Sequence, residues 1–162
     1  MIEIVEKRDT GKITNEMKIE FAAVSDNEGF ARMAVAAFVT SLNPTLEEMS
    51  DVKTAVSEAV TNAVIHGYEN RNDLKDKVHM CCVLKGDLLE VEVMDQGVGI
   101  EDVERAMEPL YTSRPELDRS GMGFAFMEAF MDHLEVFSEP GNGTVVRMYK
   151  KLGISSWIDS EE

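Results

Sequence analysis

The residues best suited to chemistry lie in the segment SEAVTNAVIHG, residues 57–67. Glu58, Asn62 and His66 recur at every fourth position, so on a helix they form one ridge. An asparagine amide oxygen is a neutral ligand for a hard cation, and a carboxylate one turn away can take a proton or hold a metal-bound water. The same spacing fits a solvated helix face, and His66 is more typical of a helix C-terminal cap than of a ligand. The segment therefore predicts either a polar surface or one wall of a cation-dependent site.

A second segment, DQGVGI at residues 95–100, follows an apolar stretch that ends in Met94. Asp95 is thus an acceptor at the carboxyl end of a predicted strand, and Gly97 and Gly99 allow the backbone to come close to a ligand. A tight turn explains the glycines equally well.

A third segment, RSGMGF at residues 119–124, places glycines at the start of a predicted helix. Free backbone N–H groups and the positive end of the helix dipole suit a phosphate there, and Arg114 and Arg119 add positive charge. A flexible loop with ordinary cationic side chains has the same composition. The order of the three segments is more informative, because a nucleotide site needs a metal anchor, a base-reading acceptor and a phosphate cradle.

Two long helices precede these glycine segments. Apolar residues at helical spacing predict a helix over 26–42, and a longer one that ends near Gly67. Both starts carry the pattern of a capping box, Ser25 with Glu28 and Thr45 with Glu48.

Alternating or apolar runs predict strands at residues 17–23, 77–85, 88–94, about 134–138 and 144–150. The second and third pair most simply as a hairpin around Gly86 and Asp87. A long connection over 95–123 holds one short helix around 101–107, and a further helix covers 122–132. This order predicts an α+β fold, a two-layer α/β sandwich with a mixed, mostly antiparallel sheet.

The 162 residues suffice for one domain, which we place at residues 15–152. Residues 1–14 are expected to be a partly disordered extension or an extra edge strand, and 153–162 an acidic tail. The formal net charge of −15 disfavours direct binding to nucleic acid or to anionic membranes. No apolar run spans a bilayer and the first residues lack a signal peptide's apolar core, which predicts a cytoplasmic protein. The adjacent Cys81 and Cys82 would point to opposite faces of a strand, so no disulfide is expected.

The three segments, in this order, resemble the N, G1 and G2 boxes of the GHKL ATPase and kinase superfamily. Within it, EFAAVSDNEGFARMAVAAF, KTAVSEAVTNAVIHGYEN, PLYTSRPELDRSGMGFAFMEAFMD and GTVVRMYK resemble the sporulation anti-sigma F factor family, serine kinases of spore-forming bacteria. The resemblance covers roughly residues 15–150. The first 14 residues, residues 71–76 and the tail after Lys151 depart from it.

The resemblance implies a role for each residue of the boxes. Asn62 would hold the Mg²⁺ that bridges the ATP phosphates, and Glu58 would be the general base for a serine hydroxyl. Asp95 would accept the adenine amino group, with Gly97 and Gly99 shaping the pocket. The phosphates would be wrapped by Ser120, Gly121, Met122 and Gly123.

Three further roles also follow from the resemblance. Arg119 would offset charge on the transferring group, and residues 108–120 would be the ATP lid. Arg32, on the first helix and outside the pocket, would contact the sigma factor and the anti-anti-sigma factor in turn.

The family's activity implies a homodimer that binds ATP or ADP with Mg²⁺. It would be a protein serine/threonine kinase that binds sigma F, keeps it from core RNA polymerase, and phosphorylates and inactivates an anti-anti-sigma factor, thereby controlling sporulation transcription. Three alternatives stay open: a kinase of the general-stress type with a different sigma, a nucleotide-gated binding module in which Glu58 is merely surface, and a metabolic ATPase.

Overall fold

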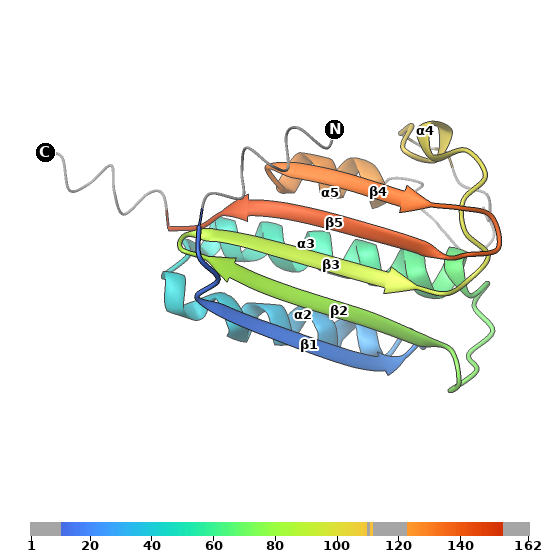
Figure 1. Ribbon diagram of the computed structural model, residues 1–162, viewed down its shortest axis with the longest axis horizontal. Coiled ribbons are helices and arrows are strands. Elements are labelled where there is room, and N and C mark those ends of the chain that lie inside the picture. Colours follow the sequence, from blue (N-terminus) through green and yellow to red (C-terminus); the bar gives the residue numbers. More distant parts are fainter. Residues whose placement is uncertain (1–10, 110, 112–122, 154–162) are drawn as a thin grey trace, which may run out of the picture.

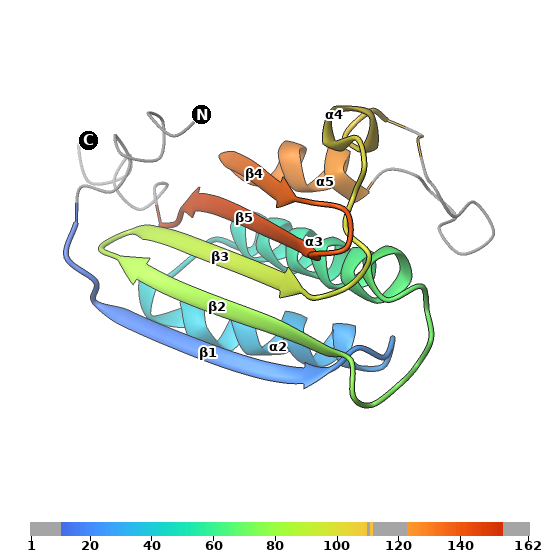
Figure 2. The same ribbon diagram turned by 45° about the vertical axis from the view of Figure 1, so that its right-hand side comes forward.

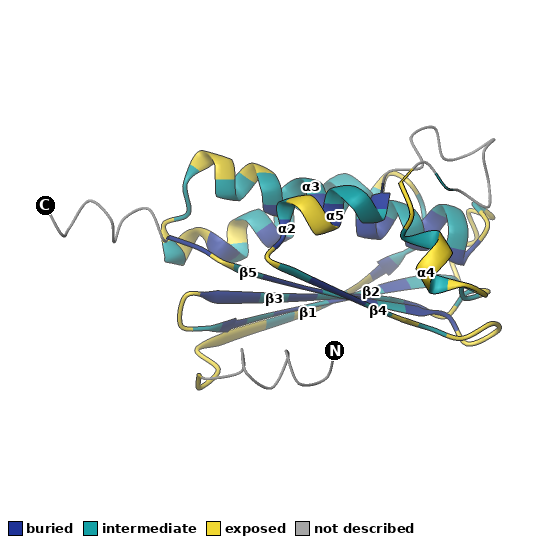
Figure 3. Ribbon diagram, turned by 90° about the horizontal axis from the view of Figure 1, so that it is seen from above, coloured by how far each residue is buried: buried dark blue, intermediate teal, exposed yellow. Residues whose placement is uncertain are grey.

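The computed structural model describes residues 11–109, 111 and 123–153, and they form two layers (Figure 1). One layer is a five-stranded sheet in the order β1-β2-β3-β5-β4, antiparallel at every described pairing. The helices cover one face of that sheet, as seen from above (Figure 3). The α+β, two-layer and mostly antiparallel architecture predicted from the sequence is confirmed.

The elements follow the predicted order closely. The strands are β1 (Asn15–Ala22), β2 (Lys77–Lys85), β3 (Leu88–Asp95), β4 (His133–Ser138) and β5 (Thr144–Lys151). The helices are α2 (Asn27–Val39), the 3₁₀ turn η1 (Thr40–Leu42), α3 (Leu46–Asn62), the π-helical turn η2 (Ala63–Gly67), α4 (Val103–Ala106) and α5 (Gly123–Phe130).

Alternation along the strands divides core from outer face. In β2 every second residue, from Val78 to Leu84, is buried under the helices. Cys82 belongs to this buried set whereas Cys81 points to the opposite face, and both thiols are free, as predicted.

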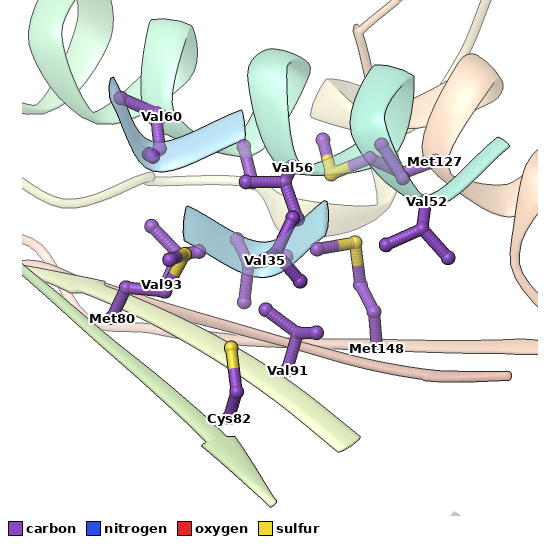
Figure 4. Packing of buried hydrophobic residues seen from close by; sticks show 14 of the residues in the cluster. Val35, Val52, Val56, Val60, Met80, Cys82, Val91, Val93, Met127 and Met148 are labelled. Atoms are coloured by element: carbon purple, nitrogen blue, oxygen red, sulfur yellow. The ribbon is translucent and has the colours of Figure 1, made fainter. Parts of the chain in front are cut away.

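Helix α3 is the centre of the helical layer, because it packs against both α2 and α5 (Figure 2). Its buried valines Val52, Val56 and Val60 meet sheet residues such as Val91 and Met148 (Figure 4). Within the described residues no helix is long and apolar enough to cross a membrane. The packing fixes the orientation of α3, and with it the direction in which its polar residues point.

One predicted capping box forms and the other does not. At α3 the backbone N–H of Glu48 donates to Thr45 Oγ1 at 3.0 Å, and the N–H of Thr45 donates to Glu48 Oε1 at 2.8 Å. The box predicted for Ser25 and Glu28 is wrong. The backbone is already helical at Asp26, so the Ser25 carbonyl accepts the Glu28 N–H, and the Glu28 carboxylate pairs with Arg32 at 3.0 Å.

This difference predicts unequal effects of two similar substitutions. Thr45→Ala removes the acceptor for the Glu48 N–H and should lower the free energy of unfolding by about 1 kcal/mol. Ser25→Ala, at an exposed residue whose hydroxyl makes no cap, should cost less than half of that. Urea unfolding of both variants checks the prediction, and an equal loss for the two would contradict it.

Candidate functional site

A cavity of about 340 Å³ lies between the end of α3, the loop after β3 and the start of α5. Four residues predicted from the sequence line it together: Asn62, Asp95, Gly99 and Gly123. Its wall also includes His66, Ile100, Arg105, Tyr111 and Thr144. The three glycine- and asparagine-bearing segments, separate in the sequence, thus meet at one place.

Asp95, the last residue of β3, is the buried acceptor of this cavity. Its side chain is among the few buried charged groups, and Oδ1 accepts the backbone N–H of Gly97 at 2.9 Å. Burial raises the pKa of Asp95 to about 6, against the lowering effect of hydrogen bonds from Gly97 and Thr144. A buried carboxylate with spare lone pairs suits a ligand that brings its own N–H donors.

Glycines hold the loop after β3 against the end of α3. The N–H of Val98 donates to the Gly67 carbonyl at 2.9 Å, and a Cβ on Gly97 would overlap that same carbonyl oxygen. A Cβ on Gly67 would lie 2.7 Å from the Asp95 carboxyl carbon. Gly99 has a φ of +74° and faces the Glu139 carbonyl. Gly97 therefore packs against Gly67 and does not line the cavity itself, whereas Gly99 lines it.

Glu58 and Asn62 face the first residue of α5. A Cβ on Gly123 would lie 3.1 Å from both amide atoms of Asn62 and 3.3 Å from Glu58 Oε2. These distances are shorter than ordinary contacts of a Cβ atom, so glycine leaves the most room for this approach. A carboxylate and a neutral amide oxygen thus stand together beside a helix N-terminus, where a cation or a proton could be handled.

The remaining predicted residues either lie outside the described residues or stand away from the cavity. Arg119, Ser120, Gly121 and Met122, with most of the predicted lid, lie outside the described residues. Arg32 is on α2, on the other side of α3 from α5, and its side chain is 42% exposed. It does not line the cavity, in agreement with its predicted place outside the pocket.

From the sequence, other pocket residues were given a different place or none. His66, expected to cap a helix, lines the cavity together with Asn62. It lies in the π-helical turn η2, where the Tyr68 N–H donates to the Ala63 carbonyl five positions back. Arg105 lies 4.8 Å from the ring centre of Tyr111, and both line the cavity. Arg105 lies on the short helix α4 and Tyr111 within the predicted lid, but no pattern in either segment marked these side chains as pocket residues.

Comparison with known proteins places the chain in a family. A sequence profile of the histidine kinase-like ATPase domain matches residues 21–150. The anti-sigma F factor of Clostridium acetobutylicum is 57% identical over 142 residues, which cover 88% of this chain and 97% of the relative. The chain belongs to the anti-sigma F factor family. A second member, from Oceanobacillus iheyensis, is 55% identical over 144 residues, covering 89% of this chain and 97% of the relative.

A solved structure has the same fold as this family member. The crystal structure of the RsbU and RsbW domains of a Mycobacterium tuberculosis protein matches with a TM-score of 0.60 and 20% identity. The match covers 86% of this chain and 33% of the other. An ATPase-type domain of the histidine kinase-like family binds ATP, so the family assignment agrees with a nucleotide-sized pocket lined by a buried acceptor.

Asp95→Asn should make the ligand-free protein more stable at pH 8. The carboxyl pKa is 3.8 when exposed and about 6 in the fold, so the folded state holds the proton more tightly and loses stability as pH rises between these values. The neutral amide avoids this loss, worth up to about 3 kcal/mol. Urea unfolding from pH 4 to 8 should show an advantage for the variant that grows with pH. A constant difference, or a less stable variant at pH 8, would contradict the prediction.

Proposed function

We propose that this chain is an anti-sigma factor that binds sigma F and blocks its association with core RNA polymerase. We further propose that it is a serine/threonine kinase, which uses ATP to phosphorylate and inactivate its anti-anti-sigma factor and so controls sporulation transcription. The observation that carries the proposal is the convergence of Glu58 and Asn62 on the start of α5, at a cavity whose buried acceptor is Asp95. The similar proteins, named anti-sigma F factors, support the choice of partner.

The cavity would take the nucleotide as follows. Asp95 accepts the adenine amino group, and Gly97 and Gly99 shape the base pocket. The N-terminus of α5 at Gly123 would hold the phosphates, and the family resemblance assigns the wrapping of the phosphates also to Ser120, Gly121 and Met122, which lie outside the described residues.

Asn62 would hold Mg²⁺ through its amide oxygen. Among the residues that the structure describes, no group of three or more acidic, histidine or cysteine side chains could hold a metal by itself. A single neutral oxygen fits Mg²⁺, which takes few protein ligands when phosphates supply the others. The ion would neutralise charge on the phosphates during transfer.

Glu58 would act as the general base. As the acceptor serine attacks, a bond forms between its oxygen and the γ-phosphorus, the bond from that phosphorus to the bridging oxygen breaks, and ADP leaves. The hydroxyl proton passes to the Glu58 carboxylate, which stands beside Asn62 at the start of α5. Arg119 would offset negative charge on the transferring group.

We propose that α2 carries the surface that binds partner proteins. Beside Arg32, the large apolar side chains of Phe30 and Met33 are 54% and 61% exposed, so that α2 offers apolar surface next to a cation. The net charge of −15 favours a partner with a basic surface over nucleic acid or an anionic membrane. We propose that the sigma factor and the anti-anti-sigma factor both bind here, to a cytoplasmic homodimer.

Three variants test the kinase against the nucleotide-gated module. Glu58→Gln should bind Mg-ATP within about threefold of wild type yet transfer phosphate to the anti-anti-sigma serine at least about a hundredfold more slowly. Asn62→Ala should lose Mg²⁺-dependent ATP binding. Arg32→Ala is the matched control, since it should keep ATP affinity while losing capture of sigma F.

The readouts are isothermal titration with Mg-ATP, transfer of labelled γ-phosphate and pull-down of purified sigma F. If the wild-type protein binds ATP but transfers no label to serine, the kinase proposal is refuted and the nucleotide-gated binding module remains. Steady ATP turnover without a protein substrate would indicate a metabolic ATPase, and capture of a general-stress sigma factor in place of sigma F would change the partner.

A further inference from the structure

Tyr68 ties together three parts of the chain behind the pocket. It follows η2, is 4% exposed, and its hydroxyl donates to the Lys77 carbonyl at 2.6 Å. The same hydroxyl accepts the backbone N–H of Gln96 at 2.8 Å. One phenol thus connects the end of the α3 segment, the start of β2 and the residue directly after Asp95.

The Tyr68 hydroxyl lies where the pairing of β2 and β3 ends. The β2–β3 register pairs His79 with Met94, so Lys77 and Gln96 are the residues that would stand opposite each other two positions further on. There the hydroxyl stands between the two backbone groups and bonds to both. The strands therefore separate immediately after Asp95, by an amount that the phenol sets.

Tyr68 is itself held from several sides. Its backbone N–H donates to the Ala63 carbonyl at 2.9 Å, closing the π-helical turn, and the Arg71 guanidinium lies 5.9 Å from its ring centre. Burial, with a smaller contribution from the negative charge of Asp95, raises the pKa of Tyr68, which keeps the phenol protonated and able to donate to Lys77. Because the Tyr68 hydroxyl is held in place and accepts the Gln96 N–H, it also holds the backbone of Gln96 in place.

We propose that Tyr68 is a positioning residue that sets the base selectivity of the pocket. Its hydroxyl holds the Gln96 backbone so that the neighbouring Asp95 carboxylate meets the amino group of adenine. The proposal rests on the proposed role of Asp95 as the adenine acceptor. Tyr68 touches no nucleotide in this account, since it does not line the cavity.

The test compares Tyr68→Phe with a matched control, Tyr149→Phe. Tyr149 is 3% exposed, equally a buried tyrosine, but it lies on β5 next to the core residue Met148 and so faces away from the helices and the pocket. The affinities for ATP and for purine riboside triphosphate, which lacks the amino group, are measured by isothermal titration. Wild type and control should prefer ATP by about tenfold or more.

Tyr68→Phe should lose about tenfold in ATP affinity but stay within twofold for the analogue, so the preference disappears. In the kinase assay KM for ATP should rise while kcat at saturating ATP stays within about twofold. A second measurement needs no variant: in the wild-type protein the exposed Gln96 should have an amide N–H protected from hydrogen exchange by its bond to the Tyr68 hydroxyl, and fast exchange there would contradict the proposal.

Two results would overturn the proposal, and they can be told apart. Equal losses for both nucleotides, or an unchanged ratio in a less stable variant, would make Tyr68 a purely structural residue. A wild-type protein that binds the two nucleotides equally, or binds neither, would show that Asp95 does not recognise the adenine amino group. In that case the proposed role of Asp95 fails, whatever the Tyr68 variant does.

Discussion

The contact between Gly67 and Gly97 is the constraint on which the rest of the site depends. The Gly67 carbonyl accepts the Val98 N–H, and neither glycine has room for a side chain against its neighbour. This contact joins the end of α3 to the loop after β3. Because of it, Asn62 on the helix and Asp95 on the strand line the same cavity instead of separate surfaces.

The pocket has an energetic cost that the core has to offset. Asp95 is buried without a cationic partner among the described ion pairs, and its pKa rises to about 6 as a result. A carboxylate that is poorly solvated in the free protein is ready to accept donors from a ligand, which is how binding sites commonly trade stability for function. The valines of α3, packed between the sheet and the neighbouring helices, supply the rigidity that this arrangement needs.

Much of the fold could be predicted because it follows from periodicity and turn chemistry. The segment KVHMCCVLK was identified as a strand paired with residues 88–94, and Thr45 with Glu48 marked the start of α3. The Ser25 box failed because sequence spacing cannot tell whether the backbone at Asp26 is already helical. Where the hydroxyl cannot face the helix N-terminus, the same residue types make no cap.

The sequence predicted which residues form the site better than it predicted how they are arranged. Asn62, Asp95, Gly99 and Gly123 do meet, and His66 joins them on the wall, but nothing in the sequence marks the π-helical turn in which His66 lies. The contacts of Tyr68 were equally hidden, because its hydroxyl bonds to the backbone of Lys77, at the start of β2, and of Gln96, directly after β3. Such long-range contacts depend on strand register, which local patterns leave open.

The most direct test of the account is the ATP affinity of Gly97→Ala, measured by isothermal titration beside Gly11→Ala, whose added methyl would make only ordinary contacts. Gly97→Ala should keep the circular dichroism of the folded sheet and helices yet bind ATP at least about tenfold more weakly, while the control should bind like wild type. Wild-type ATP affinity in a folded Gly97→Ala protein would show that the contact with Gly67 does not assemble the site.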